Sequence, residues 1–106
     1  MLVATTEHVA GHRTVETIGQ VYGVVVRSRG LGGNIVAGLR SLAGGEIKEY
    51  TSLVEDTRRQ AIDRLVMNAQ LMGADAVVMM RFDSGSIGQT MNEVVAYGTA
   101  VKLAPA

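Results

Sequence analysis

The segment from Leu53 to Met72 constrains the fold most, because it is the one long amphipathic helix that the sequence predicts. Ser52 and Glu55 have the spacing of a capping box, in which each side chain bonds a free amide of the first helical turn. Gly73 follows at the position where a left-handed residue commonly ends a helix. The apolar positions recur at helical spacing and predict one apolar stripe, made of Val54, Ala61, Ile62, Leu65, Ala69 and Met72.

Three other segments are typical of long strands. Residues 13–28 are rich in β-branched side chains, with Gly19 and Gly23 among them. Residues 76–82 begin with a continuous apolar run, and residues 84–88 are predicted to be a flexible connection. The last strand is predicted at residues 91–103, and its small residues share the face on which a helix could lie close, namely Ala96, Gly98 and Ala100.

These elements predict a single α+β domain over residues 1–106. The expected architecture has two layers, with an antiparallel sheet of about three long strands packed on the long helix. A short strand is predicted at residues 2–6, and a short helix at residues 35–42 with Asn34 as its N-cap. The last two strands are expected to form an antiparallel hairpin.

Apolar side chains occupy both faces of the predicted strands, which predicts a subunit of a homo-oligomer. Val77 and Met79 alternate with Val78 and Met80, whereas one long helix covers only one face of a sheet. Leaving an apolar patch of about 500 Å² in water would forgo about 12 kcal/mol, at about 25 cal/mol per Å². That loss is comparable to the whole net stability of a domain, so packing against further copies is the expected remedy.

Charge and composition narrow the classes of function. Ten acidic residues balance ten basic ones, whereas a nucleic-acid-binding protein is expected to carry a basic excess. There is no cysteine, which excludes disulfides and thiolate chemistry. No signal-peptide pattern and no apolar stretch of about 20 residues is present, so we expect a cytoplasmic protein that binds neither nucleic acid nor membrane.

Metal binding is the first hypothesis for a site. His8 and His12 are four residues apart, a spacing that brings two imidazoles to one metal if the segment is helical. Gly11 and the β-branched residues that follow favour a turn or loop instead, and Glu7 could add a third ligand. The cofactor of such a site would be a divalent metal ion. Thioethers are an alternative for Cu(I), and they belong to Met67, Met72, Met79, Met80 and Met91, although core methionines usually fill gaps.

Anion binding and catalysis are the other two hypotheses. A glycine-rich loop before the short predicted helix could present amides to an anion, next to two arginines, and its residues are Arg27, Arg29, Gly32, Gly33 and Asn34. The same loop could equally be a tight turn at a subunit contact. Glu46, Glu49 and Tyr50 are expected on a loop between rigid elements, where a buried carboxylate could act as a general base. No Ser-His-Asp order and no Gly-x-Ser-x-Gly motif stands out, so an enzyme is the least favoured class.

Several short motifs, in order along the chain, resemble the YbjQ-like family of small bacterial and archaeal proteins. They are Thr5-Thr6, Gly32-Gly33-Asn34-Ile35, Gly38-Leu39-Arg40, Gly44-Gly45-Glu46 with Tyr50, Gly73-Ala74-Asp75-Ala76-Val77 and Gly98-Thr99-Ala100-Val101. The resemblance implies a dodecin-like subunit, a homopentamer and no established activity, under the family description "putative heavy-metal-binding".

Three functional interpretations remain open at this point. The favoured one is a homo-oligomeric protein that holds a small ligand or a heavy metal at its subunit contacts. The second is a structural or interaction scaffold with no ligand of its own. The third is an enzyme whose active site is shared between subunits.

Overall fold

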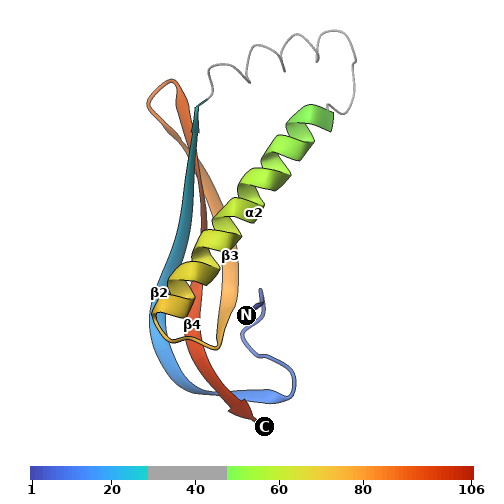
Figure 1. Ribbon diagram of the computed structural model, residues 1–106, viewed down its shortest axis with the longest axis vertical. Coiled ribbons are helices and arrows are strands. Elements are labelled where there is room, and N and C mark those ends of the chain that lie inside the picture. The colour runs from blue at the N-terminus through green and yellow to red at the C-terminus, as the bar shows by residue number, and fades with distance from the viewer. Residues whose placement is uncertain (29–47) are drawn as a thin grey trace.

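The computed structural model describes residues 1–28 and 48–106. Within them, β1 (Leu2–Val3), β2 (His12–Ser28), β3 (Ala76–Ile87) and β4 (Met91–Pro105) form one sheet, and α2 (Lys48–Leu71) lies across one face of it (Figure 1). The α+β class, the strand within residues 13–28 and the β3–β4 hairpin are thereby confirmed. The short helix expected at residues 35–42 lies outside the described residues. Among the described residues, no helix has the length and apolar character needed to cross a membrane.

The sheet has the order β1-β3-β4-β2 and is mixed, so the expected antiparallel sheet is wrong at one edge. β4 pairs antiparallel with both β2 and β3, whereas β1 runs parallel to β3. Only Leu2–Val3 of the strand expected at residues 2–6 is regular. The backbone bonding nevertheless continues, because Ala4 N donates to Val77 O at 2.8 Å and Met79 N donates to Thr6 O at 3.1 Å.

A bulge in β3 makes this bonding to the N-terminal segment possible. The register with β4 shifts between Val78 and Arg81, and Met79 has a φ of 55°, which is rare for a residue with a side chain. The amides of Met79 and Met80 both donate to carbonyls of the N-terminal segment. Arg81 adds a side-chain bond, with Nη1 donating to Thr5 O at 2.8 Å. The N-terminal segment is therefore held on β3 by backbone and side-chain contacts together.

The long helix is confirmed, but its start is not where the capping box placed it. α2 begins at Lys48, so Ser52 lies inside the helix and the capping box that it would form with Glu55 is wrong. The C-terminal end agrees with the sequence, since α2 ends at Leu71 and Gly73 has a φ of 81°. Local spacing thus identified the helix and its end, whereas a capping motif can also occur by chance within a helix.

The connection predicted at residues 84–88 is also wrong for most of its length. β3 continues to Ile87, which pairs with Met91 of β4, and the turn is confined to residues 88–90 with Gly88 at a φ of 61°. Residues 84–86 read Ser-Gly-Ser, a composition with low strand propensity. Pairing with β4 along the whole hairpin overrides that propensity.

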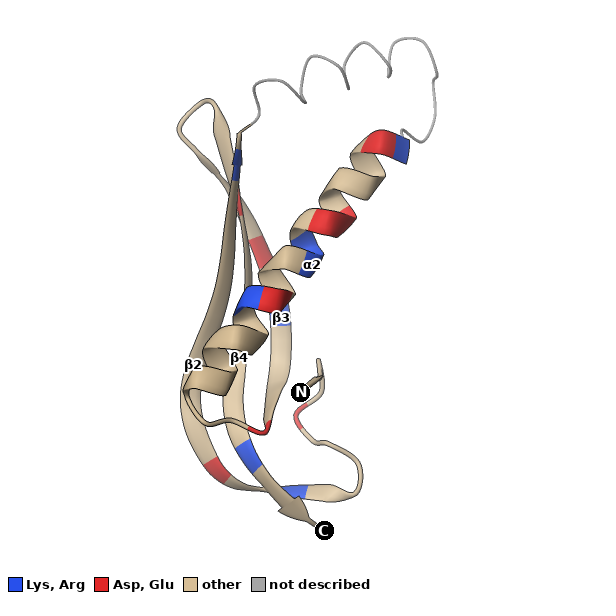
Figure 2. Ribbon diagram, in the orientation of Figure 1, with Lys and Arg blue, Asp and Glu red and all other residues tan. Residues whose placement is uncertain are grey.

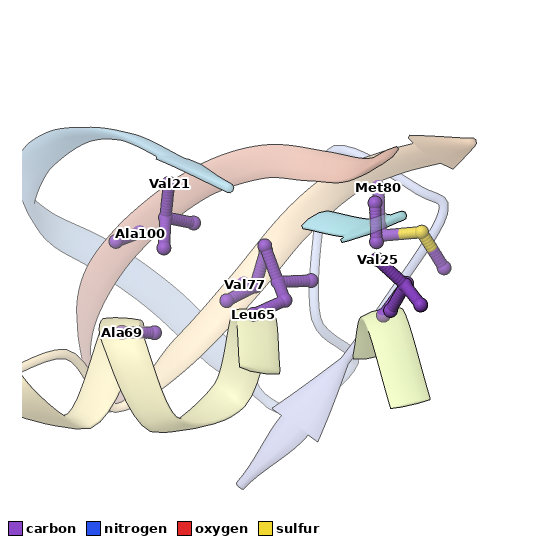
Figure 3. Close-up of a cluster of buried hydrophobic side chains, with 9 residues drawn as sticks. Val21, Val25, Leu65, Ala69, Val77, Met80 and Ala100 are labelled. Carbon is purple, nitrogen blue, oxygen red and sulfur yellow. The ribbon is translucent and has the colours of Figure 1, made fainter. Parts of the chain in front are cut away.

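The core lies between the sheet and the second half of α2. Its buried residues come from α2 and from the three long strands β2, β3 and β4 (Figure 3). They are Val21, Val25, Ala61, Leu65, Ala69, Val77, Met80, Ala96 and Ala100. Ala96 and Ala100 are fully buried in the core with residues of α2, which confirms that these two small residues of β4 face the helix, whereas a Cβ at Gly98 would meet Val77 and Val78 of β3. Thr57 is the one buried polar residue among those described, and its Oγ1 donates to Leu53 O at 2.8 Å.

Gly23 lets the helix approach β2 backbone to backbone. A Cβ atom built on Gly23 would lie 2.0 Å from Ala61 O and 2.4 Å from Leu65 N. The contact is therefore possible only without a side chain at this position. It anchors the second half of α2 on β2, while the first turns of the helix, up to Asp56, carry no buried residue.

Candidate functional site

The outer face is the side of the sheet away from α2. Its distal half, which is the half nearer to the turn between β3 and β4, exposes large apolar side chains. The exposed residues are Tyr22, Val24 and Val26 of β2, Met79 of β3 and Tyr97 of β4, with the half-buried Val95 of β4 beside them, and those of β2 and β4 alternate with residues that face the helix. Tyr22 pairs with Tyr97, and Val24 pairs with Val95. Tyr22 is 49% exposed and Val26 also 49%. A strand surface of this composition is usually buried against another layer.

The proximal half of the outer face is covered by the chain itself. Ala76, Val78 and Val101 form a second buried cluster, against which Val9 of the N-terminal segment packs together with Leu103. The segment that Arg81 and the β3 bulge hold in place therefore covers one half of the outer face and leaves the other half bare. This division separates a self-contained region from a surface that is open for contact.

A shallow groove lies on the bare half of the outer face. It has a volume of about 480 Å³, and it is lined by Gln20, Tyr22, Met79, Asp83, Val95, Tyr97, Gly98 and Thr99. The Tyr22 hydroxyl donates to Gln20 Oε1 at 2.7 Å, which fixes one phenol at the rim. With two tyrosines and a methionine, the groove combines apolar surface with a small number of polar atoms, as ligand sites do.

The distal cleft is a second hollow, on the opposite side of the sheet between the first half of α2 and the β3–β4 hairpin. It has a volume of about 520 Å³, and it is lined by Val54, Arg58, Phe82, Asp83, Ser84, Gly85, Ser86, Asn92, Glu93 and Val94. The cleft exists because the buried residues of α2 begin only at Thr57, so the first turns of the helix do not pack on the strands. The Arg58 guanidinium lies 5.0 Å from the centre of the Phe82 ring.

The two histidines lie outside any helix and close to solvent. His8 is in the segment before β2, and its Nε2 lies 4.0 Å from Glu7 Oε2, with the His8 side chain 88% exposed. His12 is the first residue of β2, and its Nδ1 lies 3.1 Å from Ala10 O. The described residues contain no group of three or more His, Cys, Asp or Glu side chains close enough to hold a metal ion. Among the described residues, Glu7 is thus the carboxylate that comes nearest to His8 in an ion pair.

The methionines proposed as an alternative metal site are spread over different surfaces. Met67 is exposed on α2, Met79 lies on the outer face, and Met80 is buried on the opposite side of the sheet in the core. The structure therefore does not bring these thioethers together, and Met80 fills core space as expected of an isolated methionine.

Most of the expected anion loop lies outside the described residues, namely Arg29, Gly32, Gly33 and Asn34, as does Glu46. Arg27 is described and lies near the end of β2, on the same side of the sheet as Val25 and therefore as α2. Its Nε atom is buried and has no hydrogen-bond partner among the described residues. Glu49 and Tyr50 lie in the first turn of α2, so their placement on a loop is wrong, and Tyr50 is 48% exposed.

Arg58, Phe82 and the tyrosine pair are the residues that sequence reasoning missed. Arg58 stands next to Arg59 on a charged stretch of the helix, which by itself indicates only a solvated surface. Its distinction comes from the approach of Phe82, a residue of another element. For Tyr22 and Tyr97, the alternation of each strand gave the face, but only the β2–β4 register places them side by side.

Comparisons with known proteins show the family of this chain. A family model described as "Putative heavy-metal-binding" matches residues 1–104. A UPF0145 protein of a Bradyrhizobium species is 65% identical over all of this chain and 96% of its own length. UPF0145 proteins of Picrophilus torridus and Lactiplantibacillus plantarum are 55% and 57% identical over 99% and 96% of the chain, and over 89% and 88% of their own lengths.

One solved structure supports the fold independently of sequence. A protein of unknown function from Pediococcus pentosaceus superposes with a TM-score of 0.65 over 98% of both chains, at 13% sequence identity. At that identity the likeness concerns the fold alone. The family model and the curated relatives together place the chain, over nearly its whole length, in the YbjQ-like family of UPF0145 proteins.

Proposed function

We propose that this protein is a binding protein that works as a homo-oligomer, with the bare half of the outer face as its subunit contact and a small ligand held there. The observation that carries the proposal is the exposure of paired apolar side chains on that face. Tyr22, Val24 and Tyr97 are each between 39% and 49% exposed, on strands whose opposite side is a buried core. Burying such a surface against a second copy gains hydrophobic free energy at about 25 cal/mol per Å².

A second copy is the occupant that the charge pattern favours. Between Glu16 and Arg27, β2 carries no charged residue, and β4 carries none between Glu93 and Lys102 (Figure 2). The bare half of the outer face therefore carries no charge on these stretches of β2 and β4, and Asp83 of β3 is the charged residue in the lining of its groove. A mainly apolar surface of this kind fits another apolar surface, and the same face of another copy provides one.

The strand edges also favour self-association. Beyond Arg81, the described part of β3 pairs with β4 on one side only, because β1 and the N-terminal segment stop at the bulge. Unpaired edges of this kind are completed by neighbouring strands in many assemblies. The number of copies, five, is what the family resemblance implies, and a heavy metal held by His8 and His12 is the alternative ligand on the same basis.

The groove lined by Tyr22, Met79 and Tyr97 is where a ligand would be held between subunits. Its volume of about 480 Å³ lies within the range of small-molecule sites. A facing subunit would close it from the open side, since the groove is shallow in a single chain. Phenol, thioether and carboxamide groups suit an organic ligand with apolar and hydrogen-bonding parts.

Native mass spectrometry of untagged protein, combined with sedimentation equilibrium at micromolar concentration, tests the proposal. We expect a single oligomeric mass that exceeds the protein mass by a stoichiometric amount, and elemental analysis then separates a metal from an organic ligand. A folded species at the 11.2 kDa of one chain would contradict the oligomer. If the oligomer carries no additional mass either after purification or after incubation of the purified protein with cell extract, the result would instead support a scaffold.

A further inference from the structure

The distal cleft lies on the opposite side of the sheet from the proposed subunit contact, and its chemistry differs from that of the outer face. We propose that it is a second site, which binds a small organic anion with an apolar body, and that Arg58 pairs with the carboxylate or phosphate of that ligand. The proposal goes beyond the assembly function and stands whether or not the outer face forms an oligomer.

The first support for the site is the set of contacts that the Arg58 side chain makes. Its guanidinium is held 5.0 Å from the centre of the Phe82 ring. Within the described residues, however, the Arg58 side chain makes no hydrogen bond and no ion pair. By contrast Arg59, the next residue, has Nη1 at 3.4 Å from Asp56 Oδ1. A guanidinium that lies against an aromatic ring and has no hydrogen-bond partner among the described residues can offer its fork of N–H donors to a carboxylate or phosphate.

The second support is the lining opposite Arg58. Residues 84, 86, 92 and 94 alternate with residues that face away, so Ser84, Ser86 and Asn92 line the cleft together with Val94. The Ser84 hydroxyl can donate to an oxyanion, while Val54, Phe82 and Val94 provide apolar contact. This combination of a few polar groups and an apolar wall is what small-ligand sites contain, and about 520 Å³ is room for a ligand of that size.

A second arginine extends the same surface. Arg27 pairs with Asn92, which in turn pairs with Ser86, so the three residues form one row across β2, β4 and β3 on the side of α2. The buried Nε of Arg27 has no partner among the described residues. Arg27 does not line the cleft itself, so what it adds is a positive charge near the row and not a bond to the ligand.

Two acidic residues, Asp83 and Glu93, also line the cleft. They would repel a bound anion if their carboxylates pointed into the cleft. By alternation along the strands, Asp83 and Glu93 point toward the outer face, and Asp83 also lines the groove there. Asp83 Oδ1 further accepts a bond from Ser84 N at 2.9 Å, which holds it at the backbone. Alternation therefore turns these two carboxylates away from the side of the sheet on which Arg58 lies.

Methyl NMR of valine-labelled protein tests the site, because Val54 and Val94 line it and Val101 serves as a distant reference. The probes are benzoate, phenyl phosphate and benzyl alcohol at millimolar concentrations. We expect one or both anions to shift the Val54 and Val94 methyls with saturation, and the neutral alcohol to bind at least about tenfold more weakly. The stronger of the two anions distinguishes a carboxylate site from a phosphate site.

Two matched variants complete the test. Arg58→Gln should weaken the anion by about tenfold or more, because a charge-assisted bond is lost, whereas Arg59→Gln should leave the affinity unchanged. The sedimentation mass of both variants should equal that of the parent, which separates this site from the proposed assembly. Absence of shifts with both anions, equal affinity in Arg58→Gln, or equal binding of the alcohol would each overturn the proposal. Unchanged far-UV circular dichroism shows that the variants are folded, and Arg58→Lys, which keeps the charge, should retain part of the affinity.

Discussion

At Gly23 a single hydrogen atom, in place of a side chain, decides how close α2 lies to the sheet. We expect Gly23→Ala to destabilise the protein by at least about 1–3 kcal/mol, because its Cβ would overlap the backbone of Ala61 and Leu65 and the helix would have to move. Urea unfolding at a fixed protein concentration measures the change. Gly85→Ala is the matched control, since its Cβ would meet nothing within 4 Å, and it should change stability by less than about 1 kcal/mol. Equal effects of the two substitutions would contradict the role of Gly23.

Metal binding by His8 and His12 is also a matter of single residues, because it would depend on two solvated imidazoles. We expect weak binding of Zn(II), Cu(II) or Ni(II) in calorimetric titrations, and loss of that binding when His8 and His12 are both changed to Ala. Glu7, 4.0 Å from His8, is the described carboxylate that would assist. Met79→Leu is the control for the thioether alternative and should leave the titration unchanged. Submicromolar binding that survives the double substitution would place the metal elsewhere.

At the scale of elements, side chains of α2 protect the free edge of β2. Arg64 Nη1 donates to Val24 O, and Asn68 Nδ2 donates to Tyr22 O at 2.7 Å. We expect Asn68→Ala to lower the free energy of unfolding by about 0.5–1.5 kcal/mol, because one of these bonds is lost. The substitution should also quicken hydrogen exchange at the β2 edge. Gln70→Ala, on the same helix, has no such bond among the described residues and should leave both measurements unchanged.

Local patterns explain which elements the sequence could predict. The helical spacing around Leu65 and the small residues near Ala96 and Ala100 are local signals, and both led to the observed packing. The parallel pairing of β1 and the bulge at Met79 depend on contacts between distant segments, which no local pattern contains. For the candidate sites the limit is similar, since Arg58 becomes distinctive only where Phe82 approaches it from another element.

At the scale of the whole molecule, the outer face gives the sharpest prediction. We expect Val24→Lys to dissociate or weaken the oligomer, because it places a charge among the paired apolar residues of the contact. Leu71→Lys is the control, since Leu71 is even more exposed, at 82%, but lies on α2. Sedimentation velocity over a range of concentrations compares the two with the parent. A parent-like mass for the folded Val24→Lys variant would exclude the bare half of the outer face as the contact.

The position of β2 beside β4 has a consequence for how the chain reaches its folded state. The paired residues run from Ser28 with Met91 to His12 with Pro105, so every pair of this ladder joins residues 63 to 93 positions apart. Pairing at such separations closes long loops before any hydrogen bond is gained, which slows folding. During synthesis on the ribosome, β2 emerges first among the long strands and cannot pair until β4, the last strand, has been made. Until then β2 has no partner strand and its apolar side chains stay exposed, which is the condition under which unfinished chains tend to aggregate.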